Sequence, residues 1–424
     1  MSITAIFAVT MILFAVVPPE IFTEIYFSLK VPVGEMFFYI CWANAFLYAG
    51  IIAVRPFFSR QRHVSTLEDD KRDLHFMEFL GYSSFGLAMF SYVIYFGMSG
   101  VSFADIAQGF SGEIGASYAL RGELENIPGV TSLMNVAPWW FAYIAFKKFV
   151  AGRRLTRIEI ILSSVLFALV TLRGLAAFER RAIIDLFIPA AVLVIMRKTD
   201  WTPGARKFVA TLPVTAVVFV IVLFMFAEYF KTWINYYQLY SDMPFFEWSM
   251  VRLAGYYATA VNNGIMGFQD GLSTGGATTL SGLYKLPLIA ELFALGDLRD
   301  EMVTQYKFLL IRLANLEFNN PGGAVSAFLD FGLWGGALFL FIHGVIFSWI
   351  YLSARKGSLV FTLLYALVFA SALEITRVWF FGSPFGLLNL AFVPAMAGLY
   401  KLLPRKATPM PRRTRIEPRP EPAD

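Results

Sequence analysis

Long apolar runs recur along this chain. The strongest lie at 34–54, 76–98, 208–228, 326–352 and 358–381, and each could cross a bilayer as a helix, which takes about 20 residues. Weaker runs, cut short by a proline or an arginine, lie at 3–17, 130–149, 158–175, 182–196 and 384–401. The pattern therefore predicts an all-α, polytopic integral membrane protein with about ten transmembrane helices.

Composition supports the same class. Of 424 residues, 58% are hydrophobic, 17% aromatic and only 15% charged, which leaves too little polar surface to cover a soluble globule. The single cysteine, Cys41, excludes an internal disulfide and a cysteine-based metal site. The first apolar run lacks a basic leading segment and a small-residue cleavage site, so we expect a retained helix rather than a signal peptide.

The positions of the cations predict an orientation. Most of the 35 Lys and Arg residues lie in five segments: 55–72, 147–157, 197–207, 355–356 and from Lys401 onward. With ten spans, all five segments fall on one face, which the positive-inside rule assigns to the cytoplasm together with both termini. This distribution explains the net charge of +5 without a nucleic-acid partner, and we expect none.

The chain is expected to form one membrane domain, residues 1–402, followed by a disordered basic cytoplasmic tail at 403–424. Large loops are predicted on the opposite, external face at 99–129 and 229–325. Within the second loop, residues 286–317 alternate apolar and charged positions at helical spacing, which predicts a helix on the membrane surface or over a cavity. We find no internal repeat, which argues against a transporter built on inverted repeats.

Three arginines mark a short external hairpin in the segment TLRGLAAFERRAIIDLF. These are Arg173, Arg180 and Arg181, and the apolar run that follows spans roughly 22 Å against a bilayer core of about 30 Å. Ionisable groups at this depth are functional candidates, and clustered guanidinium groups suit a lipid diphosphate. The alternative is a structural salt bridge between Arg181 and Asp185, four residues apart.

A second set of candidates lies in EWSMVRLAGYYATAVNNG. Here Arg252 is followed by Tyr256, Tyr257, Asn262 and Asn263. Aromatic faces bury the apolar side of a sugar ring, while amides and arginine hydrogen-bond its hydroxyls, so these residues are candidate substrate-binding groups. The alternative is an aromatic belt at the membrane surface without a ligand.

The predicted external face carries many carboxylates, too many to single out a base. Asp330, in SAFLDFGLWGG, is the candidate we favour, and its alternative role is a hydrogen bond to a neighbouring helix. Arg377 is a further candidate for substrate binding, although Glu374 is three residues away and would pair with it on a helix. No metal-ligand spacing and no phosphate-binding glycine loop is present, so we expect neither a metal nor a cofactor.

Four segments carry a resemblance to a known family. They are NIPGVTSLMNVAPWW (126–140), RGLAAFERR (173–181), RLAGYYATAVNN (252–263) and NNPGGAVSAFLDFGLWGG (319–336). In them the chain resembles the oligosaccharide repeat unit polymerases, the Wzy-type O-antigen polymerases. The resemblance implies a glycosyltransferase of the C-type fold in the bacterial inner membrane, with its active site facing the periplasm.

The resemblance also implies substrates and partners. The enzyme would transfer a glycan from undecaprenyl diphosphate to a lipid-linked repeat unit, and a chain-length regulator protein is a further candidate partner. The external arginines of the family match Arg173, Arg180, Arg181 and Arg252 here. Two alternatives remain open: an O-antigen ligase, which uses the same donor, and a flippase or other transporter of lipid-linked oligosaccharides.

Overall fold

All regular structure in the described part of the chain is helical. The computed structural model describes residues 3–58, 67–109, 120, 129–177, 180–198, 203–234, 236–239 and 241–403. No strand occurs within these ranges, so the predicted all-α class is confirmed. Most of the predicted loop at 99–129 and the predicted tail after residue 403 lie outside the described residues.

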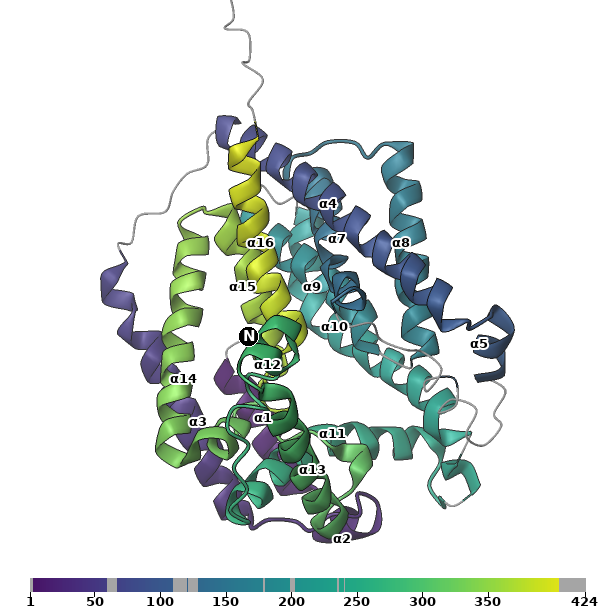
Figure 1. The fold of residues 1–424 in the computed structure, drawn as a ribbon, viewed down its shortest axis with the longest axis vertical. Coiled ribbons are helices and arrows are strands. Elements are labelled where there is room, and N and C mark those ends of the chain that lie inside the picture. The colour runs from purple at the N-terminus through teal and green to yellow at the C-terminus, as the bar shows by residue number, and fades with distance from the viewer. Residues whose placement is uncertain are drawn as a thin grey trace, which may run out of the picture.

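The first half of the chain contains long helices joined by short ones (Figure 1). Prolines begin α2 and α7, where their fixed φ suits the first helical turn, and Thr156 with Glu159 forms a capping box at the start of α8. In order, the elements are α1 (Ile3–Val16), α2 (Pro19–Glu24), α3 (Val33–Ala53), η1 (Arg55–Phe57), α4 (Leu67–Ser99), α5 (Phe103–Gly109), η2 (Thr131–Val136), α7 (Pro138–Ala145), η3 (Phe146–Val150), α8 (Arg157–Ala176) and α9 (Arg180–Arg197).

The second half contains the predicted large loop and the last three long helices. Gly332, with a φ of 70°, interrupts the helical backbone of α14, a conformation that glycine adopts without strain. In order, the elements are α10 (Pro203–Glu228), η4 (Tyr229–Trp233), η5 (Tyr237–Leu239), α11 (Phe245–Gln269), η6 (Leu283–Lys285), α12 (Pro287–Leu292), α13 (Leu295–Leu313), η7 (Leu316–Phe318), α14 (Ser326–Arg355), α15 (Leu359–Leu373) and α16 (Pro384–Leu402).

Several helices are suited to a bilayer. Within the described ranges, six are long and apolar enough to cross one: Val33–Phe57, Arg72–Met98, Arg157–Ala176, Val209–Trp233, Ser326–Arg355 and Pro384–Leu402. Two shorter helices, α1 and α15, are also apolar. The sequence therefore folds as a membrane protein, whereas the count of ten spans stays a prediction.

Some expected helices are shorter or more divided than the apolar pattern indicated. The run at 358–381 ends as a helix at Leu373, and residues 374–383 form a turn before α16. This turn contains Glu374 and Arg377, which pair with each other. The run at 130–149 is divided among η2, α7 and η3 rather than forming one α-helix.

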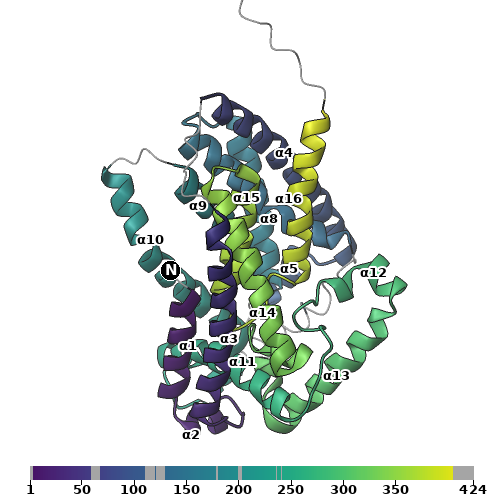
Figure 2. The same ribbon diagram turned by 90° about the vertical axis from the view of Figure 1, so that its left-hand side faces the viewer.

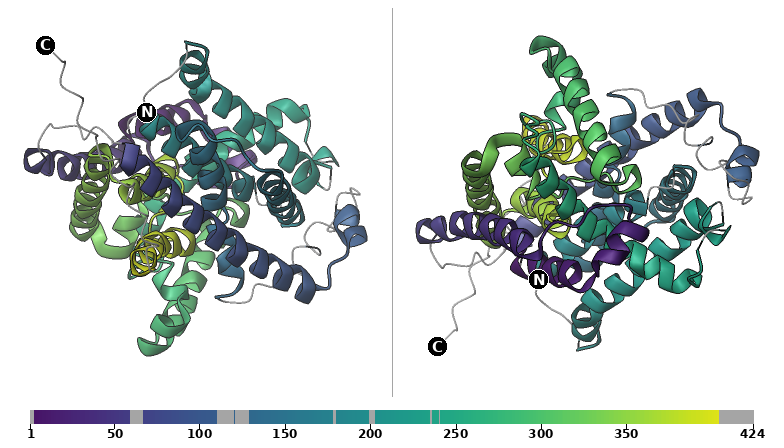
Figure 3. Two further views of the ribbon diagram at one scale, coloured as in Figure 1. Left: turned by 90° about the horizontal axis from the view of Figure 1, so that it is seen from above. Right: turned by 90° about the horizontal axis from the view of Figure 1, so that it is seen from below.

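The predicted external loop at 229–325 is mostly helical. Its central helix, α11, is largely buried and contacts α1, α10 and α14. The predicted helix at 286–317 is divided into α12 and α13, because Ala294 between them has a φ of 50°. Figures 2 and 3 show that α12 and α13 project from one side of the bundle and α5 from another.

Glycines allow two of the long helices to approach each other closely. A Cβ atom at Gly50 of α3 would lie 2.0 Å from the carbonyl oxygen of Phe341, and one at Gly344 of α14 would lie 2.1 Å from that of Leu47. Helices in membranes associate through such small residues because lipid provides no hydrophobic drive to bring them together. The pair α3 and α14 forms one of the main packing contacts of the fold.

The predicted cytoplasmic segments meet at one end of the molecule. Arg197 at the end of α9 pairs with Asp73 and donates to the carbonyl of Gly357. Lys198 donates to the carbonyl of Phe149, 2.7 Å away, and the ammonium of Lys356 lies 4.5 Å from the ring centroid of Phe58. The end of α14 and the start of α4 lie in the upper half of Figure 1, where α16 also ends.

The turn at 374–383, most of which was predicted to belong to the span at 358–381, contacts three other segments. The hydroxyl of Thr10 in α1 donates to that of Thr376 at 3.0 Å, and the Ala324 amide donates to the Ile375 carbonyl. The Gly282 amide donates to the carbonyl of Gly382 at 2.9 Å. The turn at 374–383 is thereby fastened to α1, to the segment before α14 and to the loop after α11.

Candidate functional site

Four charged side chains meet where the hairpin between α8 and α9 faces the turn at 374–383. Arg181 Nε lies 3.1 Å from Asp185 Oδ2, and Arg377 Nε lies 2.7 Å from Glu374 Oε2. Asp185 also interacts electrostatically with Glu374 and Arg377, so the two ion pairs are neighbours. We call Arg181, Asp185, Glu374 and Arg377 the hairpin cluster.

Arg181 combines its ion pair with aromatic contacts. Its guanidinium carbon lies 3.5 Å from the ring centroid of Phe380 and 5.9 Å from that of Phe385, which are cation–π distances. Its Nη2 atom is buried and has no hydrogen-bond partner among the residues that the structure describes. The salt bridge to Asp185, which was the alternative to an anion site, is therefore present. It uses Nε of Arg181, and Nη2 makes no hydrogen bond to the described residues.

The other two hairpin arginines lie on either side of the turn. Arg173 is in the last turn of α8, where a cation is favoured by the helix dipole, and it is half-buried. Arg180 is the first residue of α9, and its side chain lies outside the described part of the structure. The hairpin cluster itself holds two positive and two negative groups.

Arg252, the cation of the second candidate set, is held by two carboxylates. Its Nε lies 2.6 Å from Glu228 Oε2, and its Nη2 lies 3.0 Å from Glu317 Oε2. The Arg252 side chain is 4% exposed, that of Glu228 is fully buried, and that of Glu317 is 32% exposed. We call Glu228, Tyr237, Arg252 and Glu317 the Arg252 cluster.

Aromatic rings enclose the Arg252 cluster. Tyr237 and Trp248 each lie 5.2 Å from the guanidinium carbon, and Phe318 lies 5.1 Å from it. The Tyr237 hydroxyl donates to Glu317 at 3.0 Å, and burial together with this carboxylate raises the pKa of Tyr237 to about 12. Tyr237 is therefore a neutral hydrogen-bond donor to Glu317 at physiological pH.

Tyr256 and Tyr257 of α11 connect the two clusters. The Tyr256 hydroxyl donates to Glu228 Oε1 at 3.4 Å, and both tyrosines interact electrostatically with Arg377. The structure thus brings together five of the predicted site residues, which come from distant parts of the chain. They are Arg181, Arg252, Tyr256, Tyr257 and Arg377.

The two asparagines of α11 make structural contacts. Asn262 is fully buried, accepts from the Val31 amide at 2.8 Å and donates to the Leu29 carbonyl at 2.6 Å. Asn263 is also fully buried and donates to the Phe318 carbonyl at 2.5 Å. The NH₂ groups of both side chains thus bind the backbone of two irregular segments. The Oδ1 atom of Asn263 is buried and has no hydrogen-bond partner among the described residues.

Asp330 lies under the loop that follows α11. Its Oδ1 accepts from the Thr274 hydroxyl and, at 3.4 Å, from the Thr278 amide. Its Oδ2 accepts from the amide of Thr279 at 2.7 Å and from the hydroxyl of the same residue at 2.5 Å. Both carboxylate oxygens are therefore engaged, as in the alternative structural role, although the partners are in a loop rather than a helix.

One site residue, Glu228, was missed in the sequence. It ends the strongest apolar run, and we read that run only as a span. A carboxylate at the end of such a run must pair or stay in water, because burying an unpaired charge is costly. That rule predicts a cationic partner for Glu228, which the structure identifies as Arg252.

No metal centre is suggested by the described side chains. Within the ranges given above, no group of three or more His, Cys, Asp or Glu residues is arranged to hold a metal ion. The charged groups of the candidate site are instead arranged as arginine–carboxylate pairs.

Comparisons with known proteins give no assignment. The chain matches no protein-family model, no curated protein and no solved structure.

Proposed function

We propose that this protein is a Wzy-type polymerase of the bacterial inner membrane. It joins lipid-linked oligosaccharide repeat units, of O-antigen or a related surface polysaccharide, at the periplasmic face. Support comes from the resemblance of the four segments and from the position of the hairpin cluster, on helices and turns away from the cation-rich end. The deeply placed arginines suit a lipid diphosphate at the membrane boundary.

The observation that carries the proposal is the free part of the Arg181 guanidinium. Nη2 is buried and lacks a hydrogen-bond partner among the described residues, which is costly unless a ligand or a water molecule supplies an acceptor. A phosphate oxygen is such an acceptor, and it would form a charge-assisted hydrogen bond. Arg173 and Arg180 are the other two arginines of the same hairpin, and in this proposal they also contact the diphosphate.

The reaction needs a group that stabilises the charge on the leaving diphosphate and a base that accepts the proton of the acceptor hydroxyl. The acceptor hydroxyl attacks the anomeric carbon of the donor, and the bond from that carbon to the diphosphate oxygen breaks. Undecaprenyl diphosphate leaves with the bonding electron pair, and fixed guanidinium groups stabilise its developing charge. A carboxylate accepts the proton from the hydroxyl.

Glu317 is now the stronger candidate for this carboxylate. Asp330 was favoured from the sequence, but its two oxygens already accept hydrogen bonds from the loop at 274–279. Glu317 is part of the Arg252 cluster and is partly exposed, so an acceptor sugar would reach it. We assign the sugar-facing role to Tyr257, which is only partly buried. We omit Tyr256, which is buried and donates to Glu228, and Asn262 and Asn263, whose amides bind backbone.

Two other functions use the same features. A ligase would share the lipid-linked donor but transfer the glycan to a lipid A core. A flippase or other transporter would need charges along a path through the membrane, whereas the hairpin cluster and the Arg252 cluster both lie near the predicted external segments. This placement favours transfer chemistry over transport.

The test uses purified full-length protein in liposomes with lipid-linked repeat units. A polymerase converts them into a ladder of longer glycans with release of undecaprenyl diphosphate. A ligase gives no ladder and modifies added lipid A core instead, and a flippase moves the substrate between leaflets without forming a glycosidic bond. If the wild-type protein is shown to be folded and the repeat units still remain unchanged, the proposal is contradicted.

A further inference from the structure

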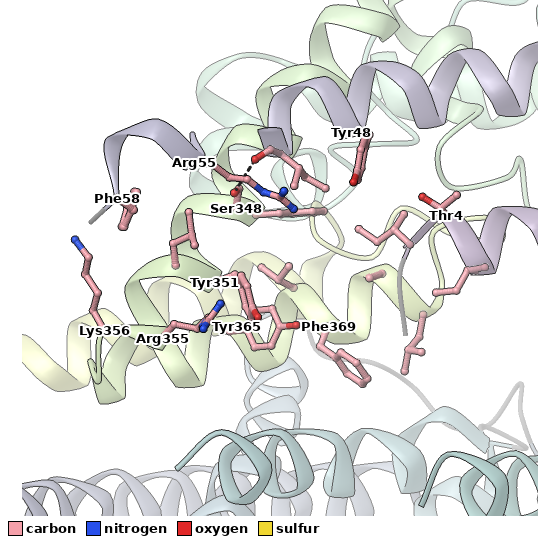
Figure 4. Close-up of a pocket in the computed structure, with 18 of the residues that line it drawn as sticks. Thr4, Tyr48, Arg55, Phe58, Ser348, Tyr351, Arg355, Lys356, Tyr365 and Phe369 are labelled. Atoms are coloured by element: carbon pink, nitrogen blue, oxygen red, sulfur yellow. Dashed lines mark hydrogen bonds between the residues drawn. The ribbon is translucent and has the colours of Figure 1, made fainter. Parts of the chain in front are cut away.

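A separate cavity lies at the cation-rich end of the molecule, away from both clusters described above. It has a volume of about 770 Å³ and lies between α1, α3 with η1, α14 and α15 (Figure 4). This volume is within the range of ligand-binding pockets, about 300–1,000 Å³. We call it the cationic groove.

The lining of the cationic groove has two chemical parts. Three cations are gathered in it, Arg55 of η1 and Arg355 and Lys356 at the end of α14, and no carboxylate is present in the lining. The remainder is mostly apolar and includes Phe347 and Phe369. A ligand that covers both parts must carry a negative charge and an apolar body.

The three cations are available to a ligand. All are exposed, and none forms a salt bridge within the part of the chain that the structure describes. Lys356 lies over the ring of Phe58 at 4.5 Å, and Arg355 lies 5.9 Å from the ring centroid of Tyr351. Aromatic faces position a cation without neutralising it, so the positive charge is retained.

Hydroxyl groups lie along the groove beside the cations. Figure 4 shows Tyr48 and Arg55 on one side and Tyr351, Arg355 and Tyr365 on the other. Tyrosine hydroxyls donate to phosphate oxygens, and the rings border an acyl chain. A phosphate head among these groups would leave the apolar tails of the lipid beside the apolar part of the lining, which includes Phe347 and Phe369.

Charge complementarity decides between the possible occupants. A free phosphate would satisfy the cations but would leave the apolar lining uncovered, and a neutral lipid would cover the lining but leave three cations without a counter-charge. Basic pockets between transmembrane helices on the cytoplasmic side are known to suit anionic lipid headgroups. We propose that the cationic groove binds an anionic phospholipid, with its phosphate at Arg55, Arg355 and Lys356.

This proposal does not depend on the glycosyl-transfer function. It requires only that this end of the molecule lies in a membrane leaflet that contains anionic phospholipid. Cation-rich segments favour the cytoplasmic leaflet, where such lipids attract basic side chains. A bound lipid would contact all four helices that surround the groove, α1, α3, α14 and α15.

The experiment measures lipid binding to the purified full-length protein in detergent. Dioleoyl-phosphatidylglycerol and dioleoyl-phosphatidylcholine are titrated separately, and bound lipid is counted by native mass spectrometry. The triple variant Arg55→Gln, Arg355→Gln and Lys356→Gln is compared with a charge-matched control. The control is Lys148→Gln, Arg153→Gln and Arg154→Gln, which removes three cations at the same end but outside the groove.

We expect the wild type and the control to prefer phosphatidylglycerol. The triple variant should bind it on the order of 100-fold more weakly, since each membrane-adjacent cation contributes several-fold to affinity. Equal binding of the two lipids by the wild type, or equal losses in the two variants, would overturn the proposal. Thermal unfolding of each variant verifies that it is folded.

Two further arms distinguish a lipid from a free anion. Ala372→Trp partly fills the apolar part of the groove while all three cations remain, and it should weaken phosphatidylglycerol binding. Inorganic phosphate at millimolar concentration should not displace the bound lipid. If phosphate displaces it fully and Ala372→Trp has no effect, the groove binds an anion rather than a phospholipid. The lipid preference of the wild type remains decisive even if a variant fails to fold.

Discussion

The guanidinium carbon of Arg181 lies 3.5 Å from the ring centroid of Phe380, although the two residues are in different halves of the chain. Arg181 is in the first turn of α9, and Phe380 is in the turn between α15 and α16. The contact joins the hairpin that was predicted on the external face to a segment that was predicted to end the span at 358–381. The guanidinium lies against the ring of Phe380 while Nη2 makes no hydrogen bond to the described residues.

Removing the Arg181 side chain should block chain growth. We expect Arg181→Ala to lower the polymerisation rate by about 100-fold or more, because a fixed donor to the leaving group is lost. Arg181→Lys should restore only part of the activity, since a point charge lacks the bidentate fork. The measurement is the length distribution of glycan products at matched protein levels in the membrane.

Two comparisons separate this role from the salt bridge. Asp185→Asn removes the bridge and should retain much more activity than Arg181→Ala, whereas equal losses would favour the purely structural role. Arg312→Ala removes an exposed cation that pairs with Asp270 and should change little. Arg173→Ala and Arg180→Ala should lower the polymerisation rate as much as Arg181→Ala does, if all three arginines contact the diphosphate.

Arg252 should affect stability as well as activity. Arg252→Ala leaves the fully buried Glu228 without its closest partner, and we expect a cost of roughly 3–5 kcal/mol in the free energy of unfolding. The double variant Glu228→Gln with Arg252→Gln should recover part of this loss, because neither side chain then carries a buried charge. Thermal unfolding of purified protein in detergent measures both effects.

The matched control for Arg252 is a partly exposed arginine with an exposed partner. Arg299 pairs with Asp300, whose side chain is 74% exposed, so Arg299→Ala should cost less than about 1 kcal/mol. If Arg252→Ala unfolds like this control while its activity disappears, Arg252 acts on substrate directly, and its ion pairs contribute little to stability.

Gly382, in the turn before α16, packs closely against the loop after α11. A Cβ atom at Gly382 would lie 1.9 Å from the carbonyl oxygen of Thr279, so Gly382→Ala should destabilise the fold by about 1–3 kcal/mol. Gly398→Ala in α16 is the control, because a Cβ atom there meets no atom within 4 Å. A helix-interior alanine at that position should be neutral or slightly stabilising. Equal unfolding temperatures of the two variants would contradict the close contact.

The predicted orientation has a direct test. Reporter fusions after residues 65, 155, 202 and 415 should report cytoplasm, and fusions near 115 and 270 should report periplasm. The described contacts between Arg197, Asp73 and Gly357 require that the segments after α9 and α14 lie on the same side as the start of α4. A periplasmic signal at residue 202 would invalidate the ten-span arrangement and detach the arginine hairpin from the proposed site.

The apolar pattern predicted the helices better than it predicted their lengths. The spacing of apolar residues and the length of each apolar run indicate a helix, because both reflect burial within one chain segment. All ten predicted runs contain helical residues. The end of α15 at Leu373 depends instead on contacts from elsewhere, such as the hydrogen bonds of residues 375 and 376 to residues 324 and 10. Such contacts leave no periodic signal.

The sequence identified most residues of the candidate site, but it did not indicate which of them contact each other across the fold. Arg181 and Asp185 pair as their spacing allowed, because partners one helical turn apart are visible in sequence. The pairing of Arg252 with Glu228 and Glu317 joins three separate elements, and no local spacing indicates it. The amides of Asn262 and Asn263 looked suitable for a sugar, but only the fold reveals that they bind backbone.

The last prediction is that transfer requires no divalent metal. A lipid diphosphate must have its leaving charge neutralised, either by a cation held on carboxylates or by fixed arginines. The acidic side chains of the hairpin cluster and the Arg252 cluster are each paired with an arginine, which opposes metal binding at the same oxygens; they are Asp185, Glu228, Glu317 and Glu374. Purified enzyme with lipid-linked repeat units in excess EDTA should therefore still build polymer. Activity that disappears on chelation and returns with magnesium or manganese would show that a metal ion, rather than the arginine hairpin, stabilises the leaving group.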